Sequence, residues 1–83
     1  MGEECSLEAG LRAFERGQYE LAATLLLPFA QAGEVRAQLL MSRLYFAGNG
    51  VEKSSIQYAY WLERAASQGD RAARAKLKRL ERR

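Results

Sequence analysis

The chain is 83 residues long, which predicts one small domain over 1–83, and it contains a single cysteine and no histidine. These counts exclude imidazole catalysis, an internal disulfide, and a metal site built from several histidines or cysteines of one chain. The longest apolar run is far shorter than the ~20 residues of a membrane-spanning helix, and the acidic first residues do not resemble a secretory signal. We therefore expect a cytoplasmic protein that does not enter a membrane.

The net charge of +3 is unevenly distributed along the chain. Residues 1–69 hold six basic and eight acidic side chains, whereas residues 70–83 hold seven basic and two acidic ones. Such a basic end can attract phosphates or an acidic partner. It can equally be a solubilising last helix whose cations lie near the negative end of the helix dipole.

Apolar residues three or four positions apart predict five helices along the chain. Glycine readily adopts the left-handed backbone of a helix end, and it separates the apolar stretches at Gly17, Gly33, Gly48, Gly50 and Gly69. Ser54 or Ser55 can cap the fourth helix, and Asp70 can cap the fifth. The predicted helices span about 6–16, 19–32, 35–47, 55–68 and 70–82.

Pro28 interrupts the second predicted helix, where it removes a backbone N–H bond and crowds the carbonyl of Thr24. We expect a kink at this position. The Thr24 hydroxyl is a candidate to bridge the freed carbonyl, and a restart of the helix after Leu27 is the alternative.

Two parts of the chain repeat each other. The frame A-x-x-G-[ED]-x-x-A of residues 30–37 recurs at 66–73, and residues 14–17 correspond to 45–48. Two units follow, at about 5–33 and 34–69, with a capping helix at about 70–83. Because short connections make neighbouring helices antiparallel, we expect an all-α fold of stacked helical hairpins.

The second unit carries the more specific pattern: Y-F-A-G-N-G-V at 45–51, then W-L-E-R-A-A-S-Q-G at 61–69. It resembles the Sel1-like repeat of the tetratricopeptide-like superfamily, and the first unit resembles the shorter repeat that often opens such arrays. The resemblance implies a short right-handed α–α solenoid that acts as a non-catalytic scaffold or adaptor in bacteria or eukaryotes. Two residues depart from the pattern. Ser54 replaces an aspartate but keeps a capping oxygen, whereas Tyr58 replaces a small residue and must turn outward, open the hairpin or contact a partner.

In such solenoids the first helix of each pair lines a concave face. Aligning the first, third and fifth helices on that assumption places Arg12, Arg43 and Arg79 in one row, with Glu15, Phe46 and Arg82 in the next. Planar guanidinium groups suit carboxylates or phosphates, so we predict a groove for an acidic peptide or an acidic protein C-terminus. Tyr58 and Tyr60 are a second, aromatic contact. The full predicted groove is Arg12, Glu15, Arg36, Leu39, Arg43, Phe46, Arg79 and Arg82.

The alternative to this groove is a set of solvated arginines without a ligand. Two other functions stay open beside the peptide-binding adaptor. The first is an inhibitor of a cognate toxin or enzyme, because some bacterial Sel1-like proteins resemble immunity or antitoxin proteins. The second is a nucleic-acid-binding accessory protein that uses the basic end. Solenoids generally need about three repeats for stability, so self-association into a homo-oligomer is a further expectation.

No residue is assigned to catalysis, to a metal or to a cofactor. The turn Gly48-Asn49-Gly50 is followed too soon by Lys53-Ser54 and is preceded by no strand, so it does not make a phosphate-binding loop. Cys5 is either a reactive thiol or an inert small residue, and no basic neighbour is predicted to activate it.

Overall fold

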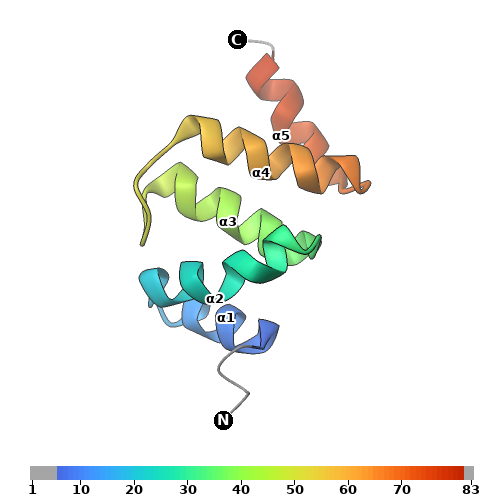
Figure 1. Cartoon of the computed structure of the whole chain (residues 1–83). Coiled ribbons are helices and arrows are strands. Elements are labelled where there is room, and N and C mark those ends of the chain that lie inside the picture. Colours follow the sequence, from blue (N-terminus) through green and yellow to red (C-terminus); the bar gives the residue numbers. More distant parts are fainter. Residues whose placement is uncertain (1–5, 82–83) are drawn as a thin grey trace.

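The computed structural model describes residues 6–81, and within them the chain forms five α-helices and no strand (Figure 1). Every predicted boundary that lies inside this range falls within one residue of the observed one, so the five helices and the all-α class are confirmed. Within the described part of the chain, no helix is both long and apolar enough to cross a membrane. The helices are α1 (Leu7–Glu15), α2 (Tyr19–Gln31), α3 (Val35–Ala47), α4 (Ser55–Ser67) and α5 (Arg71–Glu81).

Side-chain caps fix several of the helix starts. The Ser54 hydroxyl accepts a hydrogen bond from the backbone N–H of Gln57 at 3.1 Å, and the Asp70 carboxylate accepts one from Ala73 at 2.8 Å. These bonds satisfy N–H groups that a helix start leaves without intrahelical partners. Of the two serines predicted as the cap of α4, Ser54 is therefore the one that caps it.

The helices are stacked in chain order. Each helix makes its main contacts with the helices immediately before and after it in the sequence. Figure 1 shows α3 and α4 running side by side in opposite directions, with α1 and α5 at the two ends of the stack. The resulting molecule is elongated, with extents of 45 × 24 × 17 Å.

The loop between α3 and α4 is held against the start of α2. Gly50 has a φ of 73°, and a Cβ added to it would overlap the backbone of Tyr19 and Glu20. Only glycine fits both the left-handed backbone and this close approach. The contact joins the second helical pair to the first at one edge of the stack.

The core consists of two buried clusters rich in alanine. The larger one joins α1, α2 and α3 to Trp61 of α4, and its fully buried large side chains are Leu26, Met41 and Leu44. Alanines at helix contacts let the backbones approach closely. The smaller cluster holds α5 against α4 and consists of Leu62, Ala65, Ala66 and Ala73.

The carboxyl end of α2 is held by polar side chains of later helices. Nε2 of the fully buried Gln38 donates to the carbonyl oxygen of Ala30 at 2.9 Å. A guanidinium N–H of Arg64 donates to the carbonyl of Gln31 at 3.4 Å. These bonds satisfy acceptors that the last turn of a helix leaves free.

Pro28 lies inside α2, which continues through it to Gln31. The predicted alternative of a restart after Leu27 is therefore wrong. The Thr24 hydroxyl donates to the carbonyl of Glu20 at 3.1 Å, so it does not bridge the carbonyl that Pro28 leaves free. Serine and threonine in helices commonly make this bond to the preceding turn.

Candidate functional site

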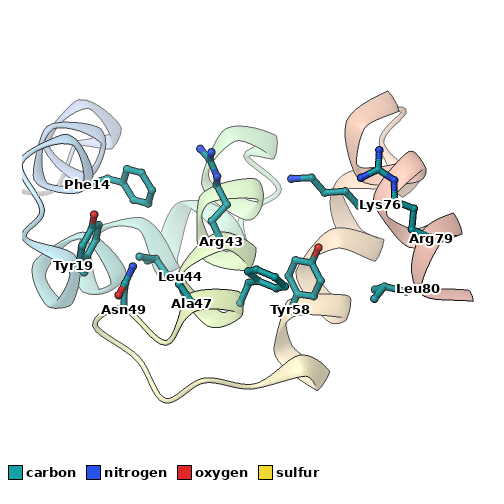
Figure 2. A pocket seen from close by; sticks show the side chains of 11 residues that line it. Phe14, Tyr19, Arg43, Leu44, Ala47, Asn49, Tyr58, Lys76, Arg79 and Leu80 are labelled. Carbon is teal, nitrogen blue, oxygen red and sulfur yellow. The ribbon is translucent and has the colours of Figure 1, made fainter. Parts of the chain in front are cut away.

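A groove with a volume of about 610 Å³ runs along the side of the stack to which α1, α3 and α5 contribute side chains (Figure 2). Tyr19 at the start of α2, the loop after α3 and one side chain of α4 complete its walls. Three of the predicted binding residues, Arg43, Phe46 and Arg79, lie in it together. We call this surface the cationic groove; it is lined by Phe14, Tyr19, Arg43, Leu44, Phe46, Ala47, Asn49, Tyr58, Lys76, Arg79 and Leu80.

Among residues 6–81, the lining of the cationic groove has three positive side chains and no carboxylate. Arg43 comes from α3, whereas Lys76 and Arg79 are three positions apart on α5 and therefore share a helix face. Figure 2 shows the Lys76 side chain extending from α5 toward Arg43. Within residues 6–81 none of the three cations has an ion-pair partner. Unpaired charges of one sign along a hollow attract ligands of the opposite sign.

Aromatic rings line the same groove as these cations. The ring of Phe46 is 5.0 Å from the ring of Tyr58, centroid to centroid, yet Phe46 remains 62% exposed. At the other end of the groove the Phe14 ring packs edge-on against Tyr19 at 5.6 Å. The guanidinium carbon of Arg43 lies 6.0 Å from the centroid of the Phe14 ring, in the range of a cation–π contact.

A second hollow of about 450 Å³ adjoins the first, because Phe14 and Arg43 line both. Most of its other walls are leucine side chains. Arg36, which stands at its edge, is paired with Glu34 at 3.9 Å. We call this surface the apolar hollow; it is lined by Leu11, Phe14, Glu15, Arg36, Leu39, Leu40 and Arg43.

The structure therefore divides the predicted groove residues between two adjoining surfaces. The cationic groove receives Arg43, Phe46 and Arg79, and the apolar hollow receives Glu15, Arg36 and Leu39 as well as Arg43. Arg82 and Cys5 lie outside the described residues.

Arg12 is the exception, and its predicted place beside Arg43 and Arg79 is wrong. It lines a separate hollow between α1 and α2, together with Arg16 and Leu21. The cause is helical geometry: residues two positions apart lie on roughly opposite sides of a helix. Because Phe14 faces the groove, Arg12 faces away from it.

The two tyrosines predicted as a second, aromatic contact also lie on different surfaces. Tyr58 is half-buried and lines the cationic groove beside Phe46, so it belongs to the groove itself. Tyr60 does not line the groove; its hydroxyl accepts a hydrogen bond from Arg64 at 3.0 Å, and its ring packs edge-on against Trp61 at 4.9 Å.

The predicted set lacks several residues that line the cationic groove, among them Lys76, Asn49 and Tyr19. The spacing of Lys76 and Arg79 on α5 is a signal that could have identified the lysine, since residues three apart share a face. Nothing local in the sequence marks Asn49 and Tyr19. They meet the groove because the loop at Gly50 packs on the start of α2.

Comparison of the chain with protein-family models, with curated proteins and with solved structures yields no significant match.

Proposed function

We propose that this chain is a non-catalytic binding module that captures an acidic peptide segment of a partner protein in the cationic groove. The observation that carries the proposal is the set of three cations without a carboxylate among the groove's lining residues. Guanidinium groups bind carboxylates through paired, charge-assisted hydrogen bonds, and the lysine adds a further positive charge.

Phe46 supplies the apolar part of such a contact. A phenylalanine that is 62% exposed leaves a large apolar surface in water, and covering it with a ligand side chain is favourable. Aromatic and arginine side chains together are the groups that most often dominate binding energy at protein interfaces. Arg43 and Phe46 are therefore the two positions at which substitution is expected to cost the most affinity.

The proposed architecture behind this groove is a short right-handed α–α solenoid of Sel1-like repeats. Its support is the contact of each helix with its sequence neighbours, together with the Ser54 cap and the Gly50 turn at their positions in the repeat pattern. In this arrangement α1, α3 and α5 contribute to one face, from which most of the groove residues come.

Fluorescence anisotropy with a labelled peptide of alternating aspartate and serine tests the function. A peptide of about ten residues extends over roughly 33 Å, which is sufficient to follow the groove. The unaltered chain is expected to bind this peptide and not a matched peptide of alternating lysine and serine. The double variant Arg43→Gln/Phe46→Ala is expected to lose binding while its helical circular dichroism stays unchanged.

The matched control is Arg12→Gln/Leu21→Ala. It also removes one cation and one exposed apolar side chain, but from the separate hollow between α1 and α2. Its affinity for the aspartate peptide is expected to equal that of the unaltered chain. Equal binding by the groove variant, or equal binding of the lysine peptide by the unaltered chain, would refute the proposal.

A further inference from the structure

The cationic groove and the apolar hollow meet at two shared side chains. Phe14 and Arg43 line both surfaces, and the Arg43 guanidinium carbon lies 6.0 Å from the Phe14 ring centroid. A ligand that leaves the groove past Arg43 therefore enters the hollow directly. The two surfaces together offer one continuous path across α5, α3 and α1.

The side chains that line this path change from charged to apolar where the groove meets the hollow. Three unpaired cations line the groove on one side. On the other side, Leu11, Leu39 and Leu40 form most of the wall, and each of them is only partly buried by the protein itself.

The charged residues of the apolar hollow reinforce this change. Arg36 lies 3.9 Å from the Glu34 carboxylate, and this exposed pair offsets part of its charge. Glu15 stands in the same hollow with no ion-pair partner among residues 6–81, and its negative charge makes the lining of the hollow less positive than that of the groove, so a carboxylate is less favourable in the hollow.

We infer that the segment recognised by this chain has two parts: a run of carboxylates that lies in the cationic groove, and an adjacent aliphatic side chain that enters the apolar hollow. This inference rests on the proposed function and specifies its ligand. Charge complementarity places the carboxylates in the more positive groove, and burial of leucine surface places the aliphatic residue in the hollow.

Three labelled peptides of equal length test the inference by anisotropy: one with aspartates throughout, one in which two leucines replace the last acidic residues, and one in which they replace the first. At least one leucine-containing peptide is expected to bind about tenfold tighter than the all-acidic one, which corresponds to the partial burial of one leucine side chain.

Two variants locate the effect. Glu15→Gln removes the negative charge at an exposed position, so the difference between the all-acidic and the leucine-containing peptides is expected to shrink at least about threefold. Leu39→Ala, checked by circular dichroism for retained helicity, is expected to remove the gain from leucine and to leave binding of the all-acidic peptide in place.

The outcomes separate this inference from the function on which it rests. Equal binding of all three peptides overturns the two-part ligand and leaves acidic-peptide capture standing. Failure of all three to bind overturns the proposed function as well. Tighter binding of a single-stranded oligothymidylate than of any peptide overturns both, because cations and aromatic rings in one groove also suit that ligand.

Discussion

Nε2 of Gln68 donates to Oε1 of Gln38 at 3.1 Å and to the carbonyl of Gly33 at 2.9 Å. Gln38 in turn donates to Ala30, so one chain of hydrogen bonds links the end of α4 through α3 to the end of α2. A fully buried amide with both of its ends satisfied fixes the positions of three helices relative to one another.

Replacing Gln38 tests the contribution of this chain to stability. Gln38→Met keeps the size of the side chain but removes its two hydrogen bonds. The Ala30 carbonyl keeps its bond from the Gly33 N–H and the Gln68 amide keeps the Gly33 carbonyl, so the loss is the net contribution of the two bonds, about 1–3 kcal/mol. We expect the free energy of unfolding in urea to fall by that amount. Gln57→Met is the control, because Gln57 is exposed on α4, and its effect is expected to stay within about 0.5 kcal/mol. Equal midpoints for the two variants would contradict the structural role of Gln38.

Gly50 and Gly17 form a matched pair for separating backbone strain from steric overlap. Both have positive φ, of 73° and 79°, but a Cβ at Gly17 meets nothing within 4 Å, whereas one at Gly50 overlaps the backbone of Tyr19. Gly17→Ala is expected to cost about 1–2 kcal/mol of unfolding free energy from the left-handed conformation alone. Gly50→Ala is expected to cost at least about 1 kcal/mol more, because the two backbones must move apart. Thermal and urea denaturation measure both, and an equal loss in the two variants would show that the loop is not held against α2.

The two adjacent serines before α4 permit a similar comparison. Ser54 accepts the hydrogen bond from Gln57, whereas Ser55 is an exposed residue at the start of the helix. Ser54→Ala is expected to lower the free energy of unfolding by about 0.5–2 kcal/mol, the usual cost of losing an N-terminal cap. Ser55→Ala is expected to change it by less than about 0.5 kcal/mol. Urea denaturation measures both losses. A larger loss for Ser55→Ala than for Ser54→Ala would show that Ser54 is not the cap of α4.

These pairs also show why the helices were predictable from the sequence. Helix spacing, glycine ends and capping side chains are local signals, since each depends on residues within one or two turns. The Asp70 cap and the five helices follow from such signals. The choice between Ser54 and Ser55 does not, because either residue type can cap and only the backbone geometry decides.

The site was less predictable because it depends on how each helix is rotated about its axis. Aligning Phe14, Tyr45 and Glu81 of the three helices placed Arg43 and Arg79 on one surface, as the structure has them, but it also placed Arg12 there. α1 packs on α2 through its buried Gly10 and Ala13, and in this orientation Phe14 lines the groove and Arg12 does not. Lys76 shares a helix face with Arg79, so its place in the groove was open to prediction from that spacing, whereas Asn49 and Tyr19 have no local signal of this kind.

If the three cations of the groove attract the acidic peptide by charge, salt must weaken its binding. From about 0.1 M to about 1 M salt the Debye length shortens from ~10 Å to ~3 Å, so the affinity of the unaltered chain is expected to fall steadily over this range. Arg43→Gln and Lys76→Gln each remove one of the groove's charges, so both variants are expected to show weaker binding and a shallower dependence on salt.

Phe46→Ala is the uncharged control. It is expected to lower affinity at every salt concentration without changing the slope of affinity against salt, because its ring carries no charge. Anisotropy titrations at several salt concentrations give these slopes. An unchanged slope in both charge variants would show that the peptide binds somewhere other than the cationic groove.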